Sequence, residues 1–317
     1  MKKYPVKLSY ISKSAIWGGN TLKNKWNKVG NGDNIAETWE LTVREKEMSK
    51  ITNGQACRMT LAEYIRACGF DSVSPTYGDG DRFPLLVKFI DAADRLSVQV
   101  HPDDLYASEA ENDSGKTEMW YIVDACDGAE IIYGLADGLN AEGFKAAVDR
   151  GELDSAMKKI KVKKGDCFFI PAGMLHAIGE GILIAEIQQN SDLTYRVYDY
   201  DRVGKDGKKR ELHTDKAFCV VRPYTEAEVD AIRFSRGREE GCLANCDYFK
   251  VSRICVNGER ELSVGESFTS LLCVDGDGYI EHDGEKYEIT KGDSYFCPAG
   301  MGCFNIVGEL TLIASEI

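Results

Sequence analysis

Two short stretches of the sequence carry potential metal-binding side chains in alternating positions. Gln99 and His101 form a Gln-x-His pattern, and Lys116 and Glu118 form a second pair with the same spacing. If each stretch is a β-strand, the two residues of a pair share one face, because successive side chains in a strand point to opposite sides. Imidazole nitrogens and carboxylate oxygens are ligands that suit a borderline divalent metal. These stretches therefore predict part of a metal site.

The fourth ligand candidate after Gln99, His101 and Glu118 is His176, which ends a stretch that occurs twice. Residues 164–176 read KGDCFFIPAGMLH and residues 291–303 read KGDSYFCPAGMGC, with eight of thirteen positions identical. A repeated unit of this kind indicates a duplicated architecture. Because the second copy has Cys303 where the first has His176, we expect the first copy to do chemistry and the second to act as scaffold.

The repeated unit also predicts the fold. Gly-Asp makes a tight turn, an apolar strand follows, and Pro-x-Gly turns the chain again, as in jelly-roll (cupin) barrels, where the next residues lie at the barrel mouth. Many short strands at even spacing are typical of an antiparallel sandwich or barrel. We predict a mainly β protein with two jelly-roll (cupin) barrels and a few helices on the N-terminal half. The expected domains are a catalytic, metal-binding cupin domain with helical elaborations at residues 1–222, and a degenerate cupin-like domain at residues 223–317.

Helix signals are clear at three places. Thr60 is a good N-cap for a helix that ends at Gly69, Asn140 caps a helix that runs to Val148, and a short helix is expected from Thr225 to Ile232. A solvated turn is expected at residues 204–209. Apolar runs predict strands at residues 84–90, 96–100, 116–123, 160–163, 167–170, 182–188 and 194–200.

Composition narrows the class of protein. The 317 residues carry a formal net charge of −13, which argues against nucleic acid and anionic membranes as partners. No apolar run approaches the length of a membrane helix and no signal-type stretch follows Met1, so a cytoplasmic location is expected. The eleven cysteines are scattered and odd in number, and Cys68, Cys167 and Cys273 read as small core residues in a reducing compartment.

A polar and aromatic run follows the first repeat, at residues 186–202. As a strand, it would place Asp192, Thr194 and Arg196 on one face. An arginine and a carboxylate near a metal can hold a sugar and move protons. The run is therefore a candidate for the substrate-binding part of the site.

Together these motifs resemble the type I mannose-6-phosphate isomerases. The resemblance covers the whole chain, which lacks the long helical insertion of the larger members and so looks like the short bacterial form. It implies a zinc enzyme that interconverts mannose 6-phosphate and fructose 6-phosphate through a cis-enediolate. The motifs that carry it are QVHP at 99–102, KTEMW at 116–120, PAGMLH at 171–176, EIQQNSDLTYR at 186–196, IWGG at 16–19 and AETWE at 36–40.

The resemblance also assigns residues. It implies one Zn²⁺ per chain, a small-molecule sugar phosphate as partner, and a monomer or weak homo-oligomer. The sequence does not rank the catalytic candidates as acid or base. The implied zinc ligands are Gln99, His101, Glu118 and His176, and the implied catalytic or substrate-binding set is Lys116, Glu186, Asp192 and Arg196.

Two other functions remain open at this point. A metal-dependent cupin oxygenase also uses histidines and a carboxylate, and a double cupin can bind sugar without turnover. Charged residues opposite the metal, Lys116, Asp192 and Arg196, disfavour both. The second barrel is expected to bind no metal, because its only histidine, His282, lies in a polar hairpin and is expected to be exposed.

Overall fold

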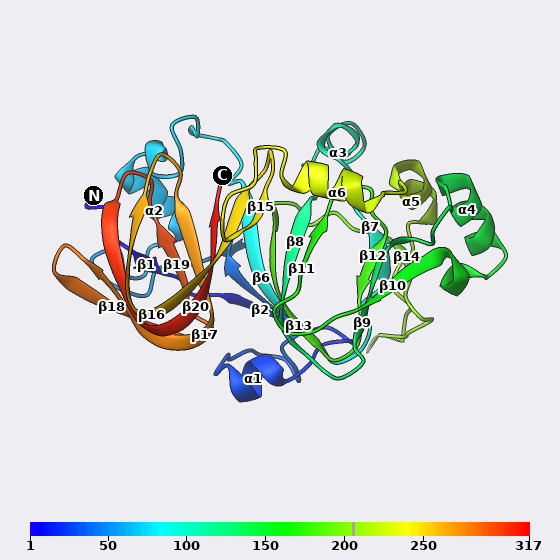
Figure 1. The fold of residues 1–317 in the computed structure, drawn as a ribbon, viewed down its shortest axis with the longest axis horizontal. Coiled ribbons are helices and arrows are strands. Elements are labelled where there is room, and N and C mark those ends of the chain that lie inside the picture. Colours follow the sequence, from blue (N-terminus) through cyan, green and yellow to red (C-terminus); the bar gives the residue numbers. More distant parts are fainter. Residues whose placement is uncertain (205–206) are drawn as a thin grey trace.

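The computed structural model describes residues 1–204 and 207–317, which form two β-structures side by side (Figure 1). The fold is mainly β and of the predicted jelly-roll type. The predicted solvated turn at residues 204–209 includes residues 205–206, which lie outside the described residues.

In the first half, two sheets face each other instead of closing into one continuous barrel, and all of their strand pairs are antiparallel. The six-stranded sheet has the order β11 (Cys167–Ile170), β8 (Glu118–Ala125), β13 (Ile182–Gln189), β6 (Leu85–Ala92), β3 (Glu37–Leu41) and β2 (Ile11–Lys13). The five-stranded sheet has the order β10 (Met157–Lys161), β9 (Glu130–Leu135), β12 (His176–Ile178), β7 (Val98–Val100) and β14 (Tyr195–Tyr198).

The second half is one sheet, in which β16, β17 and β20 are 15, 14 and 15 residues long. Its main path is β1, β19, β17, β20, β16 and β15, with β18 paired to β17. Its interior is apolar and includes Leu271, Ile280 and Phe304. The bounds are β1 (Val6–Lys7), β15 (Cys242–Asn245), β16 (Lys250–Val264), β17 (Thr269–His282), β18 (Glu285–Thr290), β19 (Ser294–Cys297) and β20 (Gly302–Glu316).

One strand of the second sheet comes from the start of the chain. Residues of β1 pair with β19, with Val6 opposite Phe296. The division at residue 222 remains a prediction, and the structure adds this N-terminal strand to the C-terminal sheet.

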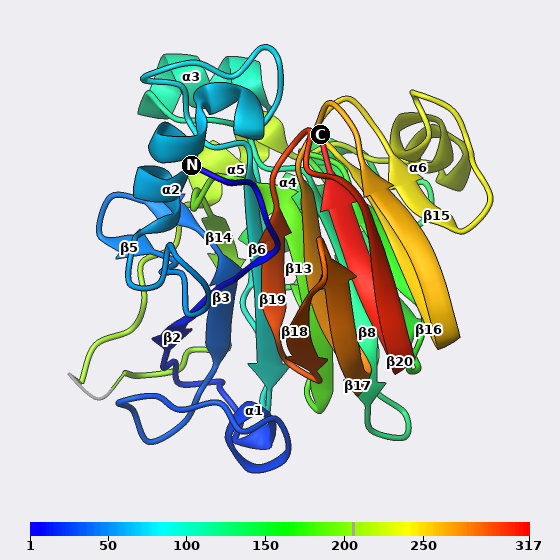
Figure 2. The same cartoon turned by 90° about the vertical axis from the view of Figure 1, so that its left-hand side faces the viewer.

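The two halves share a core. Every residue of β6 and of β13 is buried, because these central strands have the first barrel's interior on one side and the second half on the other (Figure 2). Phe83 lies 5.3 Å from Phe268, ring centre to ring centre, across this boundary. A buried ion pair reinforces it: Lys28 Nζ lies 2.6 Å from Glu40 Oε1 and donates to Gly292 O. The halves are therefore joined by packing and not by a linker alone.

The predicted helices are confirmed as α2 (Leu61–Cys68), α4 (Ala141–Asp149) and α6 (Glu226–Arg233), capped by Thr60, Asn140 and Thr225. Figure 1 shows α3, α4, α5 and α6 along one end of the first barrel. Among the described residues, no helix is long and apolar enough to cross a membrane. Three further helices were not predicted: α1 (Thr21–Lys25), α3 (Asp104–Glu111) and α5 (Thr214–Val220).

Candidate metal centre and active-site cavity

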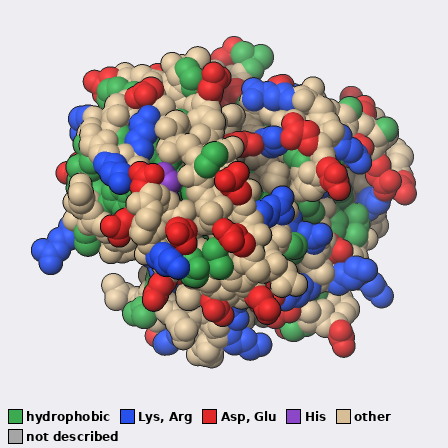
Figure 3. Space-filling view, turned by 60° about the vertical axis from the view of Figure 1, so that its left-hand side comes forward, with side chains coloured by type: hydrophobic (Ala, Val, Ile, Leu, Met, Phe, Trp, Pro, Cys, Tyr) green, Lys and Arg blue, Asp and Glu red, His purple; other side chains and the backbone are tan. Residues whose placement is uncertain are grey.

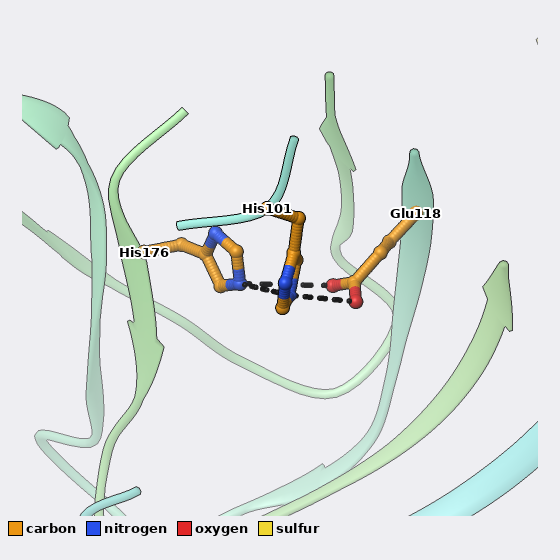
Figure 4. Close-up of side chains that lie close together, drawn as sticks. All are labelled: His101, Glu118 and His176. Carbon is orange, nitrogen blue, oxygen red and sulfur yellow. Dashed lines mark hydrogen bonds and ion pairs between the residues drawn. The ribbon is translucent and has the colours of Figure 1, made fainter. Parts of the chain in front are cut away.

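The potential ligands lie between the two facing sheets of the first barrel. His101 directly follows β7 and His176 begins β12, both in the five-stranded sheet, whereas Glu118 begins β8 in the six-stranded sheet. In Figure 4 the three side chains point toward one another from these separate segments. The inside of the barrel therefore gathers residues that are far apart in sequence.

The repeated turn explains how His176 reaches this place. Met174 N donates to Pro171 O, and Gly173 N donates to His101 O at 2.8 Å, so the turn is bonded to the backbone of another potential ligand. Gly173 has φ +90°, and a Cβ there would lie 2.9 Å from Val220 O. Glycine is required at this position, since other residues rarely adopt that φ and the space is closed.

The three side chains form one compact, buried cluster. His101 Nε2 lies 3.2 Å from Glu118 Oε1 and 3.2 Å from His176 Nε2. His176 Nε2 lies 3.8 Å from Glu118 Oε2. His176 Nδ1 donates to Met174 O at 2.8 Å, so its Nε2 carries a lone pair directed at the other two residues.

The charge states suit a cation. Burial, followed by the charge of Lys116, lowers the pKa of His101 to about 3, and burial also lowers the pKa of His176. Burial acts to raise the pKa of Glu118, but Lys116 and His101 hold it well below its usual range. Two neutral imidazoles and an ionised carboxylate are a suitable ligand set for a borderline divalent metal, so these residues fit one.

A cavity of about 350 Å³ adjoins the cluster. Lys116 connects the two, because it lines the cavity and its Nζ lies 2.6 Å from Glu118 Oε1. Gln99 also lines the cavity and lies opposite both His176 and Arg196 in the strand register. The cavity lining includes Trp17, Glu37, Lys88, Ser97, Gln99, Lys116, Glu186, Asp192, Thr194, Arg196 and Arg210.

Sequence reasoning missed a charged network in the cavity wall. Lys88 Nζ lies 3.2 Å from Glu186 Oε2 and 3.8 Å from Glu37 Oε2, and Trp39 Nε1 donates to Glu37 at 2.8 Å. Burial and the charge of Glu118 raise the pKa of Glu186 to about 7, with Lys88 opposing them. A lysine in the middle of the apolar run LLVKFIDA was the signal that could have found Lys88.

Guanidinium groups gather at the mouth of the cavity. Arg202 and Arg210 both pair with the buried Asp199, and Arg210 lines the cavity. Arg196 donates to Ser97 Oγ and to Glu211 O, and burial together with Arg210 lowers its pKa. The charges of Arg202 and Arg210 are partly balanced by Asp199 and by Asp94, which pairs with Arg202 at 3.1 Å, and acidic and basic side chains are interspersed on the face drawn in Figure 3.

The second half differs from expectation at one residue. His282 is buried, not exposed, and its Nε2 lies 3.2 Å from Met301 O. The exposure prediction is wrong because the hairpin folds back onto the turn at residues 298–301. Among the described residues, the His101–Glu118–His176 cluster is the one group of three or more His, Cys, Asp or Glu residues able to hold a metal. All eleven cysteines are free, with Cys273 buried and Cys68 and Cys167 half-buried.

The fold and this cluster define a cupin-type protein with a potential metal site of two histidines and a carboxylate. Residues 6–145 match the family model for the catalytic domain of type I phosphomannose isomerase, and residues 239–317 match that for the mannose-6-phosphate isomerase cupin domain. The chain belongs to the type I mannose-6-phosphate isomerase family.

Individual relatives agree with the family models. The chain is 37% identical to putative mannose-6-phosphate isomerase YvyI and 36% identical to mannose-6-phosphate isomerase ManA, both of Bacillus subtilis, over the full length of each protein. It is 36% identical to a mannose-6-phosphate isomerase of Streptococcus mutans, over 95% of this chain and 94% of the relative. A crystal structure of mannose 6-phosphate isomerase from Bacillus subtilis superposes with a TM-score of 0.88 at 35% identity, covering 99% of both chains.

Proposed function

We propose that this isomerase interconverts D-mannose 6-phosphate and D-fructose 6-phosphate and that it uses one zinc ion per chain. The observation that carries the proposal is the buried His101–Glu118–His176 cluster beside a polar cavity. The same cavity is lined by the four catalytic candidates, Lys116, Glu186, Asp192 and Arg196.

The metal ligands would be His101, Glu118 and His176, with Gln99 as the fourth. Gln99 is suitably placed because it lines the cavity and lies opposite His176 in the strand register. A zinc ion bound there would supply a Lewis acid for the oxygen atoms of an open-chain sugar.

The protein's own side chains would move the protons. Aldose–ketose isomerisation opens the sugar ring and then shifts a proton between C1 and C2 through a cis-enediolate. Glu186 is a candidate to accept and return this proton, because burial and the charge of Glu118 raise its pKa above the ordinary value in the protein without metal. Lys116 and Asp192 are the other candidates for ring opening and proton transfer. Arg196 would stabilise the negative charge that develops on the sugar oxygens.

The mouth of the cavity suits a phosphorylated substrate. Arg196 and Arg210 both line the cavity, so a dianionic phosphate bound there would meet two guanidinium groups. Arginine also holds phosphate oxygens in pairs through its planar group. This favours a sugar phosphate over a neutral sugar.

The proposal is tested by measuring fructose 6-phosphate formation from mannose 6-phosphate in a coupled assay. A chelator should abolish turnover, and Zn²⁺ should restore it. Full activity in protein shown by elemental analysis to be metal-free would contradict the zinc site. Binding of mannose 6-phosphate without turnover would support a non-catalytic sugar-binding cupin, and dioxygen consumption with iron or copper would support a cupin oxygenase.

We also infer that the protein acts in the cytoplasm on a small molecule, as a monomer or a weak homo-oligomer. The net charge of −13 supports the absence of nucleic acid and anionic membranes among its partners. Size-exclusion chromatography with light scattering at micromolar concentration tests the oligomeric state.

A further inference from the structure

Trp120 connects the metal cluster to the cavity wall. It lies in β8, two residues after Glu118, and its side chain is completely buried. Its indole Nε1–H points at two carboxylates: Glu118 Oε2 at 3.1 Å and Glu186 Oε1 at 2.9 Å. Glu186 comes from the neighbouring strand β13, directly opposite Trp120 in register. One donor is thus shared by a potential metal ligand and a catalytic candidate.

The second oxygen of each carboxylate lies close to other groups. Glu118 Oε1 faces His101 Nε2 and Lys116 Nζ, and Glu186 Oε2 faces Lys88 Nζ. Trp120 therefore holds one oxygen of each carboxylate, although Glu118 Oε2 also lies 3.8 Å from His176 Nε2. Since two buried carboxylates repel each other, a donor between them also reduces the cost of placing them close together.

The ring of Trp120 contacts a further ligand candidate. It lies edge-on to His176, with ring centres 5.4 Å apart. The indole thus contacts two of the three cluster residues, Glu118 by hydrogen bonding and His176 by packing.

We propose that Trp120 is a positioning residue whose shared N–H fixes Glu118 and Glu186 relative to each other, so that metal binding and the placement of Glu186 are coupled. This inference rests on the proposed function only for its effect on turnover. Without the N–H, Glu118 Oε2 and Glu186 Oε1 lose a buried donor, and each carboxylate is held only through its other oxygen, by Lys116 and His101 or by Lys88. Removing a partner that orients a metal ligand typically costs about 10–100-fold in metal affinity or activity.

The test compares Trp120→Phe with Trp26→Phe. Phenylalanine keeps an aromatic ring but removes the N–H. Trp26 is a matched control, because it is also buried and packs on Phe89 with ring centres 4.9 Å apart, outside the cluster. We expect Trp120→Phe to weaken zinc affinity, measured by chelator competition, about 10–100-fold and to lower kcat more than it raises KM. Trp26→Phe should change neither, and melting temperatures identify any loss of folding.

A spectroscopic measurement tests the coupling without turnover. The protein has four tryptophans, so a two-dimensional ¹H–¹⁵N spectrum should contain four indole signals, of which Trp120→Phe removes one. That signal should shift when zinc is added to metal-free protein, and it should also shift in Glu186→Gln. The signals of Trp26 and Trp39 should move less.

Two outcomes would overturn the inference. One is a folded Trp120→Phe protein with wild-type zinc affinity and wild-type kcat. The other is a Trp120 indole signal that does not respond to zinc. If the wild-type protein failed to convert mannose 6-phosphate, the proposed function would fall, whereas zinc affinity and the indole signal would still decide the role of Trp120.

Discussion

The same turn and strand lead to a polar cavity in the first barrel and to an apolar core in the second. After the first copy, His176 points inward and is fully buried, whereas Cys303 after the second copy is exposed. The first barrel buries charged groups, among them Lys88, Lys116, Glu118 and Glu186, but within residues 223–317 the structure shows no buried Asp, Glu, Lys or Arg. The repeated sequence therefore specifies the turn, and the side chains that the strands direct inward decide whether the interior becomes a site or a core.

The strongest test of this difference replaces the last residue of each repeated stretch, His176 or Cys303, one at a time. His176→Ala should lose metal and lower kcat by several orders of magnitude, because it removes a ligand atom from the centre of the cluster. Cys303→Ser should leave metal content near one ion per chain and kcat nearly unchanged. A stoichiometry near two ions per chain, or a folded but inactive Cys303→Ser protein, would show that the second barrel takes part in the chemistry.

Arg196→Lys tests whether the guanidinium group of Arg196 stabilises the transition state. A planar group able to hold two oxygens becomes a mobile point charge, so we expect kcat to fall by about 10²-fold with a smaller rise in KM. Steady-state kinetics separates the two effects. If the variant kept kcat and only bound the substrate more weakly, Arg196 would be a substrate-binding residue that does not stabilise the transition state.

Lys28→Met tests the scaffold role of the second barrel. It leaves Glu40 buried without its partner and removes the bond to Gly292 O, so we expect the free energy of unfolding to fall by about 3–5 kcal/mol while kcat stays nearly unchanged. Denaturant unfolding measures the loss. Lys164→Met is the matched control, since its pair with Asp275 is exposed and should contribute less than about 1 kcal/mol.

The free energy of unfolding should depend on pH, because the interior of the first half contains the titratable carboxyl group of Glu186. The pKa of Glu186 is raised to about 7 in the folded protein from an ordinary value of 4.5, so the folded state binds this proton more tightly than the unfolded state. The resulting stability is fully present below pH 4.5 and is lost as the pH rises through about 7. Without metal, wild type should therefore lose roughly 3 kcal/mol relative to Glu186→Gln between about pH 4 and about pH 8. Parallel stability curves for the two proteins would contradict the raised pKa.

The sequence predicted those features that depend on neighbouring residues. The strand at residues 167–170 and the helices capped by Thr60 and Asn140 agree with the structure, because turn glycines and capping side chains act locally. The sequence pairs Gln99 with His101 and Lys116 with Glu118, because residues two apart in a strand share a face.

Features that depend on distant partners were not predictable in this way. Trp120 lay inside a recognised motif, but its bond to Glu186 spans 66 residues and depends on the register of β8 with β13. The burial of His282 depends on the turn at Met301, and the place of β1 depends on β19. Local patterns do not show which strands far apart in the sequence become neighbours.

The pairing of β1 with β19 has a consequence for synthesis of the chain. The ion pair of Lys7 with Asp293, at the same junction, joins residues 286 positions apart. At translation rates of about 5–20 residues per second, the N-terminal strand must wait roughly 15–60 s for its partner to be made. A strand of only two residues offers little edge for wrong pairing during that interval. Pairing of β1 with β19 therefore cannot begin before Ser294–Cys297 has been synthesised.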